Sequence, residues 1–231
     1  MTVRRTRLVL VRHGQSRATV DGVVGGPRGC NGLTDLGRAQ ARALAARWAL
    51  TGELGPVDRV VSSVLPRAVE TAHELAPVLG CAAVVQDPAL NEMEPGEGDG
   101  LSWPDWDRRY GTFDLAAEPF RPLSPGGESW AAFGLRATTA LAGLGRSEDG
   151  TTVVVCHGGI IEQSVVLGFG LAAQTPPGSM VASPPNTSVT EWWVEVRDDG
   201  SLRWRLARFA DAAHLDAAGI PHGSGAPRAG P

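Results

Sequence analysis

The sequence contains no lysine, and all 21 of its basic residues are arginine. Without lysine the chain cannot hold a P-loop nucleotide site, a pyridoxal phosphate Schiff base or a lysine nucleophile. Alanine, arginine, glycine and proline are abundant, which is the composition expected of a GC-rich bacterial genome. The three exclusions hold whatever the origin of the bias.

Cysteine is also scarce, and Cys30, Cys81 and Cys156 are too few and too scattered for a disulfide framework or a zinc cluster. No apolar run approaches the roughly 18–20 residues needed to cross a bilayer, and the N-terminus lacks the apolar core of a secretory signal. A formal net charge of -4 argues against nucleic acid as the main partner. We therefore expect a cytoplasmic protein without a metal, a cofactor, a membrane or a nucleic acid partner, and the sequence indicates no oligomeric state.

Strand and helix patterns alternate along the chain. Strands are expected at 8–11, 59–62, 81–85, 151–156, 188–196 and 202–209, and helices at 35–50, 66–79, 128–144 and from about 160. This alternation predicts an α/β fold: a three-layer sandwich with helices on both faces of a mostly parallel sheet. We expect one domain over residues 1–215. The tail 216–231 is rich in Gly, Pro and Ala with little to bury, and is expected to be disordered.

Thr34 is expected to cap the helix that follows it, which reaches about Leu50. Its apolar residues with alternating spacings of three and four share one face, which we expect to be buried: Leu36, Ala39, Ala43, Ala46 and Leu50. Three arginines of this helix, Arg38, Arg42 and Arg47, lie on other faces and are expected to be solvated.

Two of the apolar strand patterns end in the same dipeptide, His-Gly. The first leads into His13 and Gly14, with Arg12 before them, and the second leads into His157 and Gly158. In open α/β sheets, ligands bind beyond the carboxyl ends of strands, where glycine permits close backbone approach and helix amide groups attract anions. A single histidine in such a place is usually structural, but two of only five histidines share this setting. The pattern favours one anion site that contains both.

A third strand pattern, 59–62, leads into Pro66 and Arg67. Proline is common at the first position of a helix, so Arg67 is expected in the first turn. Its planar guanidinium group matches two phosphate oxygens. Taken alone, a solvated surface arginine is the simpler interpretation; the position after a strand is what suggests binding.

At this point the sequence resembles the histidine phosphatase superfamily, in the branch that includes cofactor-dependent phosphoglycerate mutase. The shared blocks keep the family's order over about residues 8–160, and a later Asn186 is in a fitting place. The blocks are Arg12 to Gly14, Leu33 to Gly37 with Gln40 and Ala41, Ser62 to Ala72, Leu90 to Glu92, Pro125 to Ser129, and His157 to Gly159. Each block alone is weak, but together they are highly specific. The resemblance implies a phosphoglycerate mutase-like fold.

What the resemblance implies is a pocket where His13 takes the phosphoryl group while Arg12, Arg67 and His157 hold its oxygens. Gly158, where the next helix begins, is counted with these phosphate ligands. A neutral imidazole can attack phosphorus in line, and the charge on the equatorial oxygens is then met by arginine and the second histidine. No metal is required, because the arginines supply the positive charge.

Glu92 matches by position the acid of the family. In that role it protonates the leaving alkoxide and later acts as a base toward water. Three further acidic residues, Glu94, Glu97 and Asp99, lie nearby, so the assignment depends on the match of residues 90–92. The alternative interpretation is a solvated acidic loop without a catalytic role.

Two positions depart from the family. Six residues after the nucleophile the family often has an asparagine that helps to bind phosphate; here it is Thr19, whose hydroxyl could substitute. The family's Gly-x-Trp-Glu-Gly block appears at 96–100 without its tryptophan. The wall on the substrate side is therefore expected to differ. Specificity is expected to come from Arg17, Arg28 and the cover at 101–123, which is rich in Trp and Pro.

The leading interpretation is a phosphatase that acts on a small phosphorylated metabolite. The same chemistry serves a mutase, but mutases of this family are usually longer and more basic between the acid and the second histidine. A non-catalytic relative that binds phosphorylated partners would be expected to have lost the nucleophile or the acid, and both are present. A metal site on His13 and His157 would need carboxylates at suitable spacing, which are missing.

Overall fold

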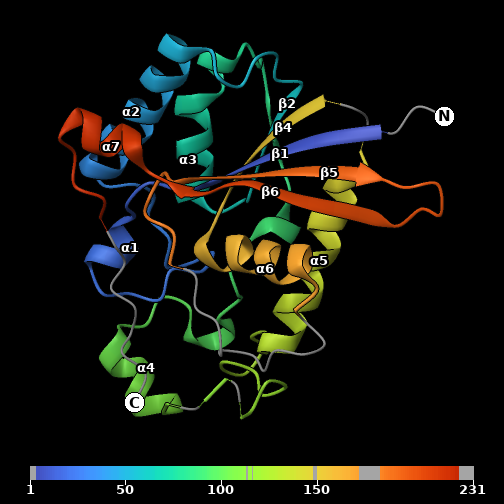
Figure 1. Cartoon of the computed structure of the whole chain (residues 1–231). Coiled ribbons are helices and arrows are strands. Elements are labelled where there is room, and N and C mark those ends of the chain that lie inside the picture. Colours follow the sequence, from blue (N-terminus) through green and yellow to red (C-terminus); the bar gives the residue numbers. More distant parts are fainter. Residues whose placement is uncertain (1–3, 113, 116, 148–149, 172–182, 224–231) are drawn as a thin grey trace.

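The computed structural model describes residues 4–112, 114–115, 117–147, 150–171 and 183–223 (Figure 1). The strands are β1 (Arg4–Arg12), β2 (Arg59–Ser62), β3 (Val84–Gln86), β4 (Gly150–Cys156), β5 (Val189–Val196) and β6 (Leu202–Asp211). The helices are α1 (Arg17–Val20), α2 (Asp35–Thr51), α3 (Pro66–Leu75), α4 (Trp103–Tyr110), α5 (Trp130–Gly145), α6 (Gly158–Phe169) and α7 (Ala213–Ala218). Short 3-10 turns lie at Pro77–Leu79, Pro88–Leu90 and Gly96–Gly98. No helix in these ranges combines the length and the apolar character that a bilayer span demands.

The six strands form one sheet in the order β3-β2-β4-β1-β5-β6. The first four strands in this order are parallel to one another. Strand β5 is antiparallel to β1, and β6 is antiparallel to β5. The predicted mostly parallel sheet is confirmed. The strand expected at 81–85 begins later than predicted, at Val84.

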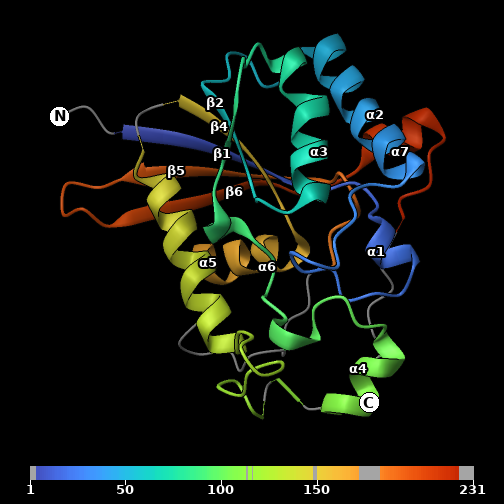
Figure 2. The same ribbon diagram turned by 180° about the vertical axis from the view of Figure 1, so that it is seen from behind.

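Helices cover both faces of this sheet, as predicted (Figures 1 and 2). Val9 and Val11 of β1 pack in the layer that contains α2 and α3, whereas Leu8 and Leu10 pack in the layer that contains α5 and α6. All four side chains are fully buried. A strand buried on both faces is apolar throughout rather than alternating, which explains the continuous run at 8–11.

The predicted buried face of α2 is wrong. Its buried residues are Gly37, Gln40, Ala41, Leu44, Ala45 and Trp48, whereas Leu50 is 88% exposed. Both faces carry apolar residues at helical spacing, so periodicity does not distinguish them. The face with Leu44 and Trp48 packs into the core cluster that also contains residues of β1 and α3, whereas Ala46 is exposed.

The expectation of a disordered tail from residue 216 does not hold for 216–223. Residues 216–218 complete α7, and Gln40 Nε2 donates a hydrogen bond to the carbonyl of Pro221 at 2.8 Å. His214, to which we gave no role, is buried and lies 2.9 Å from the Thr187 hydroxyl. The segment therefore packs against the core; residues 224–231 lie outside the described residues.

Candidate active site

His13 and His157 meet at the carboxyl end of the sheet. Strands β1 and β4 are parallel neighbours, and their register pairs Arg12 with Cys156, so the next residue of each strand is a histidine. The two ring centroids are 5.1 Å apart. Both histidines are buried. The strand pairing thus brings together the two residues that the sequence placed in one anion site.

Arg67 joins the two imidazole rings. It lies in the first turn of α3, where Pro66 begins the helix as predicted. Its Nε donates toward His13 Nε2 at 3.1 Å and toward His157 Nδ1 at 3.3 Å, and its Nη1 donates to the Gly25 carbonyl at 2.6 Å. One buried guanidinium group therefore lies against the acceptor nitrogens of both rings.

The hydrogen bonds define which nitrogen of each ring carries the proton. His13 Nδ1 lies 2.7 Å from the carbonyl of Gly14, which can only accept, so Nδ1 holds the hydrogen and Nε2 keeps its lone pair. His157 accepts at Nδ1 from Arg67, and its Nε2 then donates to the Ser63 hydroxyl at 2.8 Å. Ser63 in turn donates to Asn91 Oδ1 at 2.9 Å. The lone pair of His13 Nε2 faces the guanidinium group of Arg67.

Both rings are held in the neutral form. Burial, followed by the positive charge of Arg67, lowers the pKa of His13 and of His157 well below the ordinary value of 6.5. Arg12 lowers both pKa values further. A neutral His13 has the free nitrogen that nucleophilic attack requires.

Buried neutral histidines make the fold sensitive to acid. The pKa of His214 is also lowered, to about 4, chiefly by burial. A histidine whose pKa is lower in the folded than in the unfolded chain binds its proton preferentially in the unfolded chain, so stability decreases as the pH falls below about 6.5. We expect the free energy of unfolding to drop by up to about 1.4 kcal/mol per pH unit for each such histidine.

Urea unfolding in phosphate-free buffer between pH 7.5 and pH 5.5 measures this dependence. His214→Asn should flatten the slope, because one proton fewer is taken up on unfolding. His73→Asn is the matched control, since His73 is exposed on α3. Identical slopes for all three proteins would contradict the assignment.

Arg12 and Gly158 occupy the same end of the sheet. Arg12 Nη1 donates to the Pro184 carbonyl, and its buried Nε has no hydrogen-bond partner among the described residues. A Cβ added at Gly158 would lie 3.9 Å from that nitrogen, so the amino end of α6 is close to the guanidinium group. An unpaired buried N–H beside a helix amino end is chemically suited to a phosphate oxygen.

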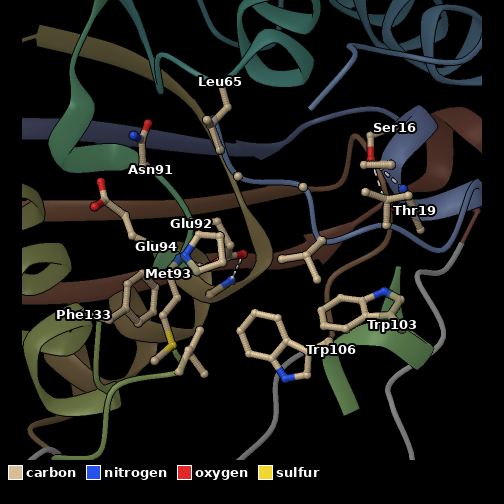
Figure 3. A pocket seen from close by; sticks show the side chains of 18 of the residues that line it. Ser16, Thr19, Leu65, Asn91, Glu92, Met93, Glu94, Trp103, Trp106 and Phe133 are labelled. Carbon is tan, nitrogen blue, oxygen red and sulfur yellow. Dashed lines mark hydrogen bonds between the residues drawn. The ribbon is translucent and has the colours of Figure 1, made fainter. Parts of the chain in front are cut away.

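Glu92 lies beside the amino end of α6. Gly159 N donates to Glu92 Oε2 at 3.0 Å, and Met93 N donates to Glu92 Oε1 at 3.1 Å. Both Glu92 and His13 line one cavity of about 990 Å³ (Figure 3). The carboxylate is therefore half-buried and oriented by backbone amides rather than free in a solvated loop.

The backbone that carries Glu92 is held by Arg136 of α5. Arg136 Nη1 donates to the carbonyls of Ala89 and Asn91 at 2.9 and 3.0 Å, and Nη2 donates to that of Glu92 at 3.3 Å. Glu128 fixes the guanidinium group through two contacts of 2.7 and 2.6 Å. Arg136 thus holds the backbone that places the Glu92 side chain.

Arg136→Met should lower kcat/KM for alkyl phosphates by about tenfold, because protonation of a poor leaving group depends on the placement of Glu92. Activated aryl phosphates, which need little protonation, should be affected much less. Arg146→Met, at the exposed end of the same helix, is the control. An equal loss on both ester classes, with an unchanged melting temperature, would exclude the positioning role.

Several functional residues were not assigned a role from the sequence. Ser63 and Asn91 fix the tautomer of His157, and Asn186 Nδ2 donates to the carbonyl of His13 at 2.8 Å. These three stand in the blocks that carry the family resemblance, which was the available signal. No such signal marks Arg136, because an isolated arginine in a helix is usually solvated.

The glycines of two motifs are explained by one close backbone contact. A Cβ at Gly14 would lie 2.4 Å from the carbonyl oxygen of Gly37, and a Cβ at Gly37 would lie 2.2 Å from that of Gln15. Any side chain at either position would separate α2 from the loop that follows His13. The contact therefore holds the loop that follows His13 against the start of α2, where Thr34 caps the helix as predicted.

Among the hydrogen bonds of the described residues, none joins Thr19, Arg17 or Arg28 to the two histidines. Thr19 is exposed in α1 and lines the cavity, with its hydroxyl 2.9 Å from that of Ser16 (Figure 3). Arg17 Nε donates to the Leu33 carbonyl, and Arg28 Nη2 donates to that of Gly96. Neither arginine is among the residues that line the cavity. Within the described ranges, no three His, Cys, Asp or Glu side chains cluster in a way that could hold a metal ion.

Known proteins resemble this chain in sequence and in fold. The sequence model described as histidine phosphatase superfamily (branch 1) matches residues 8–211. A metal-independent phosphoserine phosphatase from Arabidopsis thaliana is 30% identical over 220 residues, 93% of this chain and 85% of that protein. A 2,3-bisphosphoglycerate-dependent phosphoglycerate mutase from Brucella anthropi is 30% identical over 191 residues, 79% of this chain and 88% of that protein. The native structure of a mycobacterial glucosyl-3-phosphoglycerate phosphatase superposes with a TM-score of 0.70 at 30% identity, covering 90% of this chain and 99% of the other.

Proposed function

Because this chain belongs to the histidine phosphatase superfamily, we propose that it hydrolyses a small phosphomonoester through a phosphohistidine formed on His13. The observation that carries the proposal is the contact of Arg67 Nε with both His13 Nε2 and His157 Nδ1. A guanidinium group between two neutral imidazoles provides a nucleophilic nitrogen and a cation at one point. That combination suits transfer of a phosphoryl dianion.

In the first step, His13 Nε2 attacks phosphorus in line, and the bond between phosphorus and the ester oxygen breaks. Arg67 donates to a phosphate oxygen instead of to the ring, and Arg12 and the amide of Gly158 bind the remaining equatorial oxygens. His157 donates to the phosphate once its Nδ1, which faces Arg67 in the free site, carries a proton. Glu92 gives its proton to the leaving alkoxide. The product alcohol departs, and the phosphoryl group is now bonded to Nε2 of His13.

In the second step, Glu92 removes a proton from water, and the resulting nucleophile attacks the phosphohistidine. The bond between nitrogen and phosphorus breaks, inorganic phosphate is released, and His13 regains its lone pair. Splitting one difficult hydrolysis into two transfers is the benefit of a covalent intermediate. Glu92 thereby regains from water the proton that it gave to the leaving alkoxide.

The cavity favours hydrolysis over transfer back to substrate. A mutase that depends on a bisphosphorylated compound must bind a second phosphate, which calls for further cations. Arg12 and Arg67 are the arginines in the described lining, and both belong to the first phosphate position. Water is therefore the acceptor that this cavity can accommodate.

Release of phosphate from p-nitrophenyl phosphate tests the proposal. We expect turnover that is indifferent to a chelator and inhibited by vanadate, which can adopt the trigonal-bipyramidal geometry of the transferring phosphoryl group. The named relative from Arabidopsis thaliana is likewise metal-independent. Loss of activity with the chelator, or no inhibition at millimolar vanadate, would contradict the mechanism.

A further inference from the structure

Beyond the phosphate position, the cavity is lined mainly by apolar and aromatic side chains. Its wider part includes Met93, Trp103, Trp106, Leu115, Leu123 and Trp130. Figure 3 shows Met93 and Phe133 on one side of the opening and Trp103 and Trp106 on the other. The rings of Trp103 and Trp106 meet edge to face, with centroids 6.0 Å apart.

No arginine is available for a second anionic group of the substrate in the described lining, where Arg12 and Arg67 already serve the phosphate. The arginines on the neighbouring cover are paired with acids of their own: Arg108 with Asp105, Arg109 with Glu97, and Arg121 with Glu118. Arg28 lies against Asp99. The sequence has no lysine, and residues 172–182 contain no basic residue.

Acidic side chains line the cavity as well. Glu92, Glu94 and Asp107 all border the cavity. A carboxylate placed among them would lose water without gaining a cation, and burying an unpaired charge is costly. An aromatic or aliphatic group there would instead leave water for contact with the indole rings, which is favourable.

We propose that the substrate is the phosphomonoester of an apolar, ring-bearing alcohol that carries no carboxylate or second phosphate. The inference rests on the proposed phosphatase function and gives its leaving group a chemical class. It separates this chain from its named relatives, whose printed substrates phosphoserine and glucosyl-3-phosphoglycerate both bear carboxylates. Apolar walls, rather than an arginine clamp, select the ester.

A comparison of benzyl phosphate with O-phosphoserine and 3-phosphoglycerate tests the class. All three are alkyl esters with poor leaving groups, so their kcat/KM values compare pocket binding rather than intrinsic reactivity. We expect benzyl phosphate to be preferred by at least about tenfold over either carboxylated ester. Equal or better turnover of a carboxylated ester would overturn the proposal.

A cation introduced into the apolar wall should change the preference. Leu123→Arg should raise kcat/KM for 3-phosphoglycerate relative to benzyl phosphate by about tenfold or more. Leu135→Arg is the matched control: it adds the same charge on the exposed face of α5, where Leu135 is 71% exposed and outside the cavity. If the control moves the ratio as much as Leu123→Arg, the selectivity does not arise from the cavity.

Binding of non-hydrolysable phosphonates separates the class of ligand from the reaction. Calorimetry should show tighter binding of benzylphosphonate than of 2-carboxyethylphosphonate, and Trp103→Ala should weaken only the former. If the protein releases no phosphate from any ester but binds benzylphosphonate preferentially, the proposed hydrolysis fails and the assignment of the pocket stands. If the two phosphonates bind equally, the assignment fails even where hydrolysis is observed.

Discussion

His13→Ala should lower kcat for every phosphomonoester by about four to six orders of magnitude, because removal of a covalent nucleophile leaves only binding and electrostatic assistance. The variant should still bind vanadate or inorganic phosphate, since Arg12, Arg67 and His157 remain. Release of inorganic phosphate measures the rate, and acid-quenched labelling with radioactive substrate should show phosphohistidine in the wild type alone.

Two controls keep this result interpretable. His13 is buried, so thermal unfolding must show that the variant is folded at the assay temperature. His73→Ala changes an exposed histidine and should retain wild-type rates. Rates in His13→Ala within tenfold of the wild type would falsify the assignment of the nucleophile.

Glu92→Gln should lower kcat/KM for benzyl phosphate by about two to four orders of magnitude, and for p-nitrophenyl phosphate by far less. The difference arises because general acid catalysis assists a poor leaving group, whereas p-nitrophenolate leaves without a proton. Glutamine keeps an acceptor oxygen for Gly159 N, which is 3.0 Å from the carboxylate in the wild type, and gives up only the contact with Met93 N. kcat/KM covers only the steps up to transfer onto His13, which isolates the acid role.

The base role of Glu92 appears in a different measurement. With p-nitrophenyl phosphate the variant should release a burst of p-nitrophenol, followed by slow turnover, because water attacks the phosphohistidine without assistance. Glu97→Gln is the matched control: Glu97 pairs with Arg109 on the surface. An equal fall in kcat/KM for both esters, without a burst, would assign Glu92 a structural role instead.

The cover over the cavity shows which structural features local sequence patterns can predict and which they cannot. Residues 101–123 were expected to form a cover that contributes to specificity, and α4 occupies Trp103–Tyr110 within them. Which of their side chains face the cavity was not predictable, because loops are placed by contacts with distant parts of the chain. The expected contributors Arg17 and Arg28 are held by the carbonyls of Leu33 and Gly96.

Helix α2 likewise has one feature that the local sequence predicts and one that it does not. Its beginning at Thr34 was readable, since a capping hydroxyl acts within its own turn. Its buried face was not, because both faces carry apolar residues with helical spacing and the choice depends on how Leu44 and Trp48 fit against α3. The end of the chain is a second case: residues 216–223 look unstructured in composition, yet they pack against Gln40.

The sequence by itself determined the alternation of strands and helices and the residues that end strands β1 and β4. It did so because strand periodicity, proline at a helix start and glycine after histidine act over a few neighbouring residues. Only the tertiary structure decided the register that sets the rings of His13 and His157 5.1 Å apart, the hydrogen bonds from Arg136 to the acid loop, and the apolar lining of the cavity. Those features join residues that are far apart in the chain, and their geometry follows from the packing of the whole core rather than from any local pattern.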